Sequence, residues 1–260
     1  MQNHSLISLK SNPASRGTLI CFPYACGNAS MFYHFSQALN SDINVLGAVM
    51  PGHGGSGELP ASIEQFAVPF VRLTETQQKP VFILGYSFGG FIAFELVRKI
   101  LGSKGVAGLI LVGSPPPGIT KEMDYILTAS NDELHAYTVN CYKFNLGLLT
   151  PEERKNYFAL LRNDTRAMRT YAFPNAMLKI DTLVLLGEQE EEVEMVQNIK
   201  RWGKYLTPVT YATLPGGHTL IKSYPQALAE AVNQFIEGQL NHKQDGAGRT
   251  EWKNLHQDVV

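Results

Sequence analysis

The chain has 260 residues, 44% of them hydrophobic, and a formal net charge of -1 at pH 7. This length and apolar content fit one sizeable core in a single large α/β domain. The near-zero charge gives no reason to expect nucleic acid or a membrane surface as a partner. Residues 1–10 lack an apolar segment of signal-peptide length. Cys21, Cys26 and Cys141 form neither an even set nor a metal-ligand spacing, so we expect a cytoplasmic protein without a metal.

Short apolar runs alternate with helical patterns from Thr18 to about Gly238. This alternation is typical of a mostly parallel sheet flanked by helices. We expect strands at residues 18–22, 45–49, 81–84, 106–112, 182–186 and 209–214. We expect helices at residues 30–39, 62–77, 91–101, 193–205 and 225–236.

The alternation breaks after the three prolines at residues 115–117. Residues 118–173 contain helix starts, such as Thr150-Pro151, but no convincing strand. A segment this long is more than a simple crossover, and we predict a helical lid over the site at about residues 118–175. Polar residues dominate after Leu240, which predicts a domain at 1–240 and a disordered tail at 241–260.

A Gly-x-Ser-x-Gly motif at residues 85–89 follows the apolar run 81–84 and precedes a predicted helix. This context is that of a nucleophile elbow, in which a serine stands on a sharp turn between a strand and a helix. The flanking glycines allow a backbone conformation that a Cβ would obstruct. We therefore predict Ser87 as a nucleophile.

A serine nucleophile needs a base, and the base needs an acid that fixes its tautomer. His218 follows a predicted strand and the turn at residues 215–217, late in the chain, where this order of catalytic residues places its base. Among the other histidines, His53 lies in a glycine-rich loop and is expected to be a solvated turn residue, although contact with a substrate is an alternative.

The acid is expected in the four glutamates that follow Gly187 at the end of the predicted strand 182–186. Glu190 is the first choice and Glu191 the second. The alternative is that these glutamates stabilise the N-terminus of the helix near Val193, where negative charge is favourable. We expect most of them to do so and one to serve as the acid as well.

An oxyanion hole needs two fixed N–H donors, one of them from the residue after the nucleophile, which is Phe88. The second should come from the loop at residues 22–28, and Tyr24 is the first choice with Ala25 as the alternative. Cys26 is interpreted as a packing residue, because no base or acid accompanies it.

Four segments resemble the standalone type II thioesterases of polyketide and nonribosomal peptide assembly lines. They are residues 22–30, 51–54, 85–90 and 214–218, and residues 162–166, the pair Thr170-Tyr171 and Trp202 also fit that family's pattern. The resemblance runs from about residue 16 to about residue 237. It implies an α/β-hydrolase fold, a Ser-His-Asp triad and hydrolysis of acyl groups from the phosphopantetheine of acyl or peptidyl carrier proteins, with no further cofactor. A monomer is the default expectation.

The sequence departs from this pattern at three positions. Cys26 stands where the family usually has glycine, and His53 where it usually has arginine, so a charged contact is expected to be missing. Glu190 stands at the position of the family's aspartate, and its extra methylene must be absorbed by the turn.

Residues 154–179 contain six basic side chains and one acidic side chain, a net charge of +5. Arg162, Arg166 and Arg169 have a spacing that places them on one helix face. Carrier proteins are commonly acidic, so this face is either a carrier-protein docking surface or a solvated helix face. Two further functions stay open from the residues: a general carboxylesterase of the same fold, and a non-catalytic carrier-protein binder.

Overall fold

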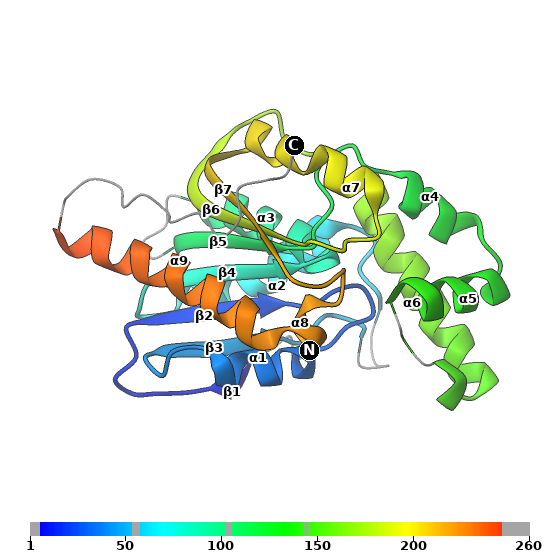
Figure 1. Ribbon diagram of the computed structural model, residues 1–260, viewed down its shortest axis with the longest axis horizontal. Helices are drawn as coiled ribbons and strands as arrows, with labels where there is room; N and C mark the ends of the chain where they lie inside the picture. Colours follow the sequence, from blue (N-terminus) through cyan, green and yellow to red (C-terminus); the bar gives the residue numbers. More distant parts are fainter. Residues whose placement is uncertain (1–5, 54–57, 102–105, 143, 145, 246–260) are drawn as a thin grey trace.

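The computed structural model describes residues 6–53, 58–101, 106–142, 144 and 146–245 (Figure 1). Its centre is a seven-stranded sheet with the order β1-β3-β2-β4-β5-β6-β7, in which β1 pairs antiparallel with β3 and all other pairs are parallel. The strands are β1 (Leu6–Lys10), β2 (Gly17–Phe22), β3 (Ile43–Ala48), β4 (Val81–Tyr86), β5 (Val106–Val112), β6 (Leu178–Gly187) and β7 (Leu206–Leu214).

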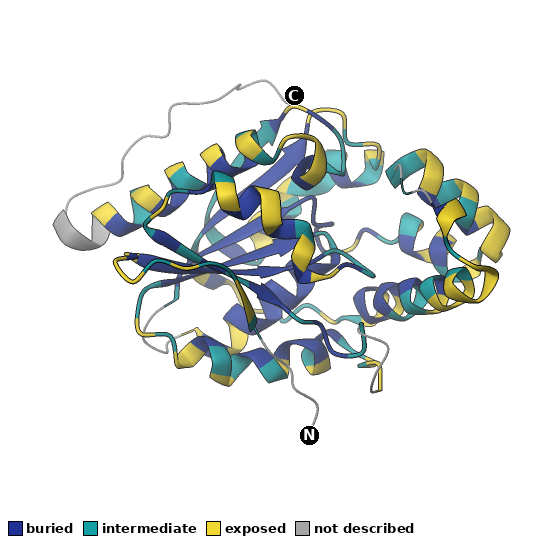
Figure 2. Cartoon of the chain, turned by 90° about the horizontal axis from the view of Figure 1, so that it is seen from below, coloured by how far each residue is buried: buried dark blue, intermediate teal, exposed yellow. Residues whose placement is uncertain are grey.

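Helices cover both faces of the sheet. On one face α1 (Tyr33–Ala38) and α9 (Pro225–Asp245) pack in one apolar cluster. On the other face α2 (Ile63–Glu75), α3 (Phe88–Ile100) and the 3-10 helix η3 (Ile199–Lys204) pack in a second cluster. Three short helices complete this part of the chain: η1 (Ala29–Phe32), α7 (Val193–Asn198) and α8 (Leu220–Ser223). Figure 2 shows the central strands buried between these layers.

The central strands are buried on both faces, which explains their continuous apolar sequences. All six residues of β2 and of β4 are buried. A parallel sheet with helices on both sides requires this pattern, whereas an alternating pattern would leave polar side chains in the core. The apolar sequence of β4 therefore predicts a buried strand that ends directly before the candidate nucleophile Ser87.

A helical insertion, residues 118–175, separates β5 from β6. It contains α4 (Lys121–Thr128), α5 (Asn131–Tyr142), the 3-10 helix η2 (Leu146–Leu148) and α6 (Pro151–Thr170). Figure 1 shows these helices beside the sheet, not on either of its faces. A small apolar cluster holds them together, and Thr150 and Glu153 form a capping box that starts α6.

The six predicted strands and the mostly parallel sheet are confirmed, with shifted ends. Strand β1 was not predicted, and α3 begins at Phe88 instead of residue 91 because the turn at Ser87 leads directly into the helix. The predicted helix 193–205 is α7 followed by η3. Helix α9 continues to Asp245, past the predicted boundary at 240, and residues 246–260 of the predicted tail lie outside the described residues. In the described part of the chain no helix has the length and apolarity needed to cross a membrane.

Candidate active site

Ser87 stands on a strained turn between β4 and α3. Its φ of 51° and ψ of -117° lie in a region that non-glycine residues rarely adopt. Its backbone N–H donates to the carbonyl of Val112 at 2.8 Å, and its carbonyl accepts the Ser114 hydroxyl at 2.9 Å. These two contacts with the end of β5 hold the turn in place.

The glycines around Ser87 are required by close backbone contacts. A Cβ on Gly85 would lie 2.3 Å from the carbonyl oxygen of Gly89, and a Cβ on Gly89 would lie 2.2 Å from that of Phe22. Backbone atoms cannot move aside as a flexible side chain can. The Gly-x-Ser-x-Gly pattern therefore reflects tight packing of the elbow against β2 as well as the turn itself.

His218 lies beside Ser87, in the loop after β7. Its Nε2 is 3.3 Å from the Ser87 hydroxyl oxygen. Its Nδ1 lies 3.1 and 3.2 Å from the two carboxylate oxygens of Glu190. A carboxylate accepts hydrogen bonds, so Nδ1 carries the proton and Nε2 is left to accept the proton of the serine.

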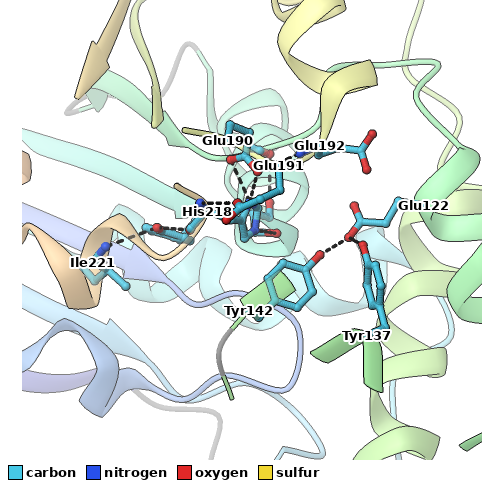
Figure 3. A network of polar contacts seen from close by, with 11 residues as sticks. Glu122, Tyr137, Tyr142, Glu190, Glu191, Glu192, His218 and Ile221 are labelled. Carbon is cyan, nitrogen blue, oxygen red and sulfur yellow. Dashed lines mark hydrogen bonds and ion pairs between the residues drawn. The ribbon is translucent and has the colours of Figure 1, made fainter. Parts of the chain in front are cut away.

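Glu190 reaches His218 because the loop after β6 is joined to the loop after β7. The N–H of Glu188 donates to the Leu214 carbonyl, and the N–H of Gln189 donates to the Gly216 carbonyl. The Glu190 side chain is 1% exposed. Figure 3 shows it pointing at His218.

The neighbouring glutamates have other partners. Glu191 accepts the backbone N–H of His218 at 3.3 Å, and the Glu192 side chain accepts from the N–H of Glu194 at the start of α7. Burial of the imidazole opposes its protonation, but the hydrogen bond and charge of Glu190, followed by the charges of Glu122 and Glu191, raise the pKa of His218 above 6.5. The loop is thus arranged to stabilise an imidazolium.

Tyr86 anchors the loop that carries His218, and sequence analysis missed it. Its hydroxyl donates to the carbonyl of His218 at 2.6 Å and accepts the N–H of Ile221 at 3.3 Å. Tyr86 is the variable residue before the serine, so the motif pattern gives no signal for it. Its full burial on β4 makes it a rigid support.

The residues predicted for the oxyanion hole lie in the loop after β2 and at the start of α3. Tyr24 and Ala25, in the loop after β2, line a cavity together with Ser87 and His218. A hydrogen bond of 2.8 Å from the N–H of Gly27 to the carbonyl of Tyr24 turns this loop. Phe88 is the first residue of α3, and the first N–H groups of a helix have no acceptor within the helix.

Two of the three residues that depart from the family pattern, Cys26 and His53, contact the carboxylate of Asp164 next to this loop. Cys26 has a φ of 61°, the left-handed region that favours glycine, and its N–H donates to an Asp164 carboxylate oxygen at 2.9 Å. Its burial and the charge of Asp164 raise the pKa of its thiol well above 9.0, which agrees with a packing role.

The solvated position expected for His53 is wrong. Its side chain is 4% exposed, and its Nε2 lies 3.1 Å from a carboxylate oxygen of Asp164. The prediction failed because the loop at residues 50–53 turns inward under the helical insertion. At the position where an arginine contact was expected to be missing, His53 contacts Asp164 instead, and this contact is charged when His53 is protonated.

The cavity at Ser87 extends into the helical insertion. Apolar and aromatic side chains form most of its wall, and Thr165 adds a buried hydroxyl without a hydrogen-bond partner in the described chain. The insertion contributes Glu122, Met123, Ile126, Thr138, Tyr142, Phe144, Tyr157, Leu161, Thr165 and Met168. Two other large apolar residues of the insertion are not among those that line the cavity: Phe158 packs inside the insertion, and Leu148 is 86% exposed.

Tyr142 covers one side of His218, with ring centroids 5.2 Å apart. The hydroxyls of Tyr142 and Tyr137 both donate to one carboxylate oxygen of Glu122, the second at 2.6 Å (Figure 3). Sequence analysis missed these three residues, because they come from two different helices and match no local motif. They tie α4 to α5 beside the site.

The arginines predicted on one helix face of α6 differ in their surroundings. Arg162 donates to the Asn131 side chain at 2.8 Å and to the Ala129 carbonyl at 2.7 Å. Arg169 donates to Asp124 at 2.7 Å. The Arg166 side chain is exposed and has no hydrogen-bond or ion-pair partner among the described residues. Two of the three thus hold the insertion together.

A parallel sheet with a serine on the turn after its central strand, a histidine beside it and a carboxylate behind the histidine defines an α/β hydrolase. In the described ranges no group of three or more His, Cys, Asp or Glu side chains is placed to hold a metal ion. Comparison with known proteins narrows the class. The chain matches the thioesterase domain family over residues 17–239 and belongs to that family, so it is a thioesterase.

Relatives and solved structures agree with this family. The chain is 27% identical to the thioesterase PikA5 of Streptomyces venezuelae, over 86% of this chain and 82% of PikA5. It is also 27% identical to the antimetabolite synthetase AmbE of Pseudomonas aeruginosa, over 84% of this chain but 10% of AmbE. The structure of YbtT, a type II thioesterase from yersiniabactin biosynthesis, superposes with a TM-score of 0.76 at 24% identity, covering 91% of this chain and 98% of YbtT. This last similarity supports the α/β-hydrolase fold.

Proposed function

We propose that this thioesterase hydrolyses acyl thioesters carried on the phosphopantetheine of acyl or peptidyl carrier proteins in polyketide or nonribosomal peptide assembly. The observation that carries the proposal is the chain of side-chain contacts from Ser87 to His218 and from His218 to Glu190. Ser87 and His218 line a largely apolar cavity. The similarity to PikA5 and to the type II thioesterase YbtT supports the choice of substrate.

In the proposed reaction, His218 Nε2 takes the proton of Ser87 while the serine oxygen attacks the thioester carbonyl. Glu190 stabilises the imidazolium that forms. The backbone N–H groups of Tyr24 and Phe88 stabilise the negative oxygen of the tetrahedral intermediate. The intermediate collapses, the phosphopantetheine thiol leaves with the proton from His218, and Ser87 stays acylated.

Water completes the cycle. His218 removes a proton from the water that attacks the acyl-enzyme, and it returns that proton to Ser87 when the free acid leaves. The side chains and backbone of this chain supply every proton transfer and charge contact in this scheme, and the phosphopantetheine belongs to the substrate. We therefore propose a reaction without a cofactor.

Arg166 is the candidate contact for an acidic carrier protein, because its side chain is exposed and free to meet a partner. Arg162 and Arg169 contribute positive charge to the same helix while they hold the insertion. Arg166→Glu should raise the KM for an acyl carrier protein more than the KM for a small acyl thioester. Equal KM changes for the two substrates would remove Arg166 from the docking surface.

The deciding experiment compares hydrolysis of an acetyl group on a holo carrier protein with hydrolysis of a p-nitrophenyl ester, using wild type and Ser87→Ala. We expect turnover that depends on Ser87 and strongly favours the carrier substrate. Ester turnover without carrier turnover would indicate a general carboxylesterase. Carrier binding without turnover of either substrate would indicate a non-catalytic binder.

A further inference from the structure

Asp164 lies on helix α6 of the insertion. Its carboxylate contacts the loop after β2, which carries one of the proposed oxyanion donors. It is 0% exposed. One oxygen accepts the N–H of Cys26 at 2.9 Å, and Nε2 of His53 contacts both oxygens at 3.1 to 3.2 Å. Three segments that are distant in the sequence meet at this carboxylate.

His53 completes the contact with the loop from its other side. Its Nδ1 lies 3.0 Å from the carbonyl oxygen of Gly27. Both ring nitrogens therefore face oxygens that can only accept, provided that Asp164 is ionised. This geometry fits an imidazolium paired with a carboxylate. Burial opposes its charge, but the hydrogen bond and charge of Asp164 and the bond to Gly27 raise the pKa of His53.

The pair acts on both sides of the proposed oxyanion hole. Asp164 accepts the N–H of Cys26, directly after Tyr24 and Ala25, and Cys26 has a φ of 61°. The ring of His53 lies on the ring of Phe88, with centroids 6.4 Å apart and an interplanar angle of 16°. Neither Asp164 nor His53 lines the cavity, so neither is placed to touch the acyl group.

We propose that Asp164, paired with His53, is a positioning residue that holds the oxyanion loop in its active shape and makes that shape depend on the position of helix α6. This inference rests on the proposed function. The strained backbone at Cys26 needs an acceptor for its N–H, and that acceptor is supplied by the insertion instead of by the sheet. A displacement of α6 removes the acceptor and releases the loop.

The expected consequence is a loss of transition-state stabilisation without a loss of substrate binding. Removing one oxyanion donor typically lowers kcat by a factor on the order of 10² to 10³. Asp164→Ala should lower kcat for an acetyl thioester of N-acetylcysteamine by a factor on the order of 10², with KM changed less than about threefold. The small thioester is used because it needs no carrier-protein docking.

Four further variants separate positioning from general support of the fold. His53→Gln should also lower kcat. His53→Arg keeps a cation beside Asp164 and should retain most of the wild-type kcat. Cys26→Gly should keep near wild-type kcat, because glycine adopts the left-handed conformation without strain and keeps its N–H. Tyr171→Phe removes the hydrogen bond from the C-cap residue of α6 to Glu95 but keeps both contacts of Asp164, so its loss of kcat should be much smaller than that of Asp164→Ala.

The outcomes are distinct. A folded Asp164→Ala variant with kcat within threefold of wild type overturns the inference, as does a loss confined to KM or an equal loss in Tyr171→Phe. If Asp164→Ala does not fold, the pair His53→Gln and His53→Arg decides by the same criterion. A wild-type enzyme that hydrolyses neither this thioester nor a p-nitrophenyl ester would refute the proposed function itself.

Discussion

At the scale of single residues, the candidate acid depends on a match between side-chain length and loop geometry. Glu190 brings both carboxylate oxygens to within about 3.2 Å of Nδ1 of His218 while its own side chain is 1% exposed. The loop that carries it is fixed by hydrogen bonds to the carbonyls of Leu214 and Gly216. The extra methylene of glutamate, relative to aspartate, is therefore absorbed by the turn.

Replacement of Glu190 by glutamine should lower kcat by a factor on the order of 10³ to 10⁴, because a neutral amide neither fixes the tautomer nor stabilises the imidazolium. Glu191→Gln is the matched control, since Glu191 contacts the backbone N–H of His218 and not its ring. Steady-state kinetics on an acyl thioester measure both. A loss in Glu191→Gln that equals the loss in Glu190→Gln would move the acid by one residue.

Glu190→Asp tests the fit of the turn directly. A shorter side chain withdraws the carboxylate from Nδ1 of His218 by about one C–C bond, roughly 1.5 Å. We expect this variant to be less active than wild type, although it restores the residue type usual in the family. Full or increased activity would mean that the loop adjusts freely to side-chain length.

At the scale of elements, the end of helix α6 is attached to α3 through a buried carboxylate. Glu95 is 1% exposed and accepts hydrogen bonds from Arg98 at 2.6 and 2.7 Å and from the hydroxyl of Tyr171 at 2.7 Å. Lys99 adds a contact at 3.2 Å. Because α3 begins directly after the candidate nucleophile Ser87, this cluster joins the insertion to the helix that follows the proposed elbow.

Tyr171→Phe removes a donor to this carboxylate while it keeps the ring. A hydrogen bond to a charged group contributes about 1.5 to 3 kcal/mol, so we expect a lower free energy of unfolding by about 1.5 kcal/mol. Urea denaturation measures the change. Tyr125→Phe is the control, because Tyr125 on α4 is 41% exposed, and it should be nearly neutral. Equal changes in the two variants would contradict the assigned contact.

At the scale of the whole molecule, buried contacts between histidines and carboxylates join the sheet domain to its loops and to the insertion. His53 faces Asp164, and His218 faces Glu190. Both histidines have a raised pKa, whereas hydrogen bonds from Arg98, Tyr171 and Lys99 lower the pKa of Glu95 against the effect of burial. The stability of the fold is therefore expected to depend on pH at both ends of the range.

The direction of the change in stability with pH follows from the pKa shifts of these groups. A raised histidine pKa contributes stability that is fully present below the unfolded value of about 6.5 and is lost as pH rises through the folded value. The lowered pKa of Glu95 contributes stability that is present above its unfolded value and is lost as pH falls through the folded one. We expect the Tm to pass through a maximum between these limits.

His53→Gln should weaken the decrease of Tm above about pH 6.5, because it removes one of the two histidine contributions. Asp164 faces His53 from α6, and the Cys26 thiol and the Tyr157 hydroxyl lie near that carboxylate. Calorimetry of both proteins across the pH range measures the difference. If Tm changed with pH equally in wild type and in His53→Gln, the contact between His53 and Asp164 would not contribute to the pH dependence of stability.

The amino-acid sequence by itself determined the features that are local in the chain: the apolar run and glycines of the elbow, the positions of Ser87 and His218, and the alternation that predicts a parallel sheet. The tertiary structure decided which of the four glutamates between residues 188 and 192 faces His218, and it placed His53 against Asp164 and Tyr142 beside His218. It also added β1, whose short edge pairing gives little periodic signal. The physical reason is that local patterns report backbone conformation and burial, whereas contacts such as that between Cys26 and Asp164 join residues 138 positions apart and depend on how loops and helices pack.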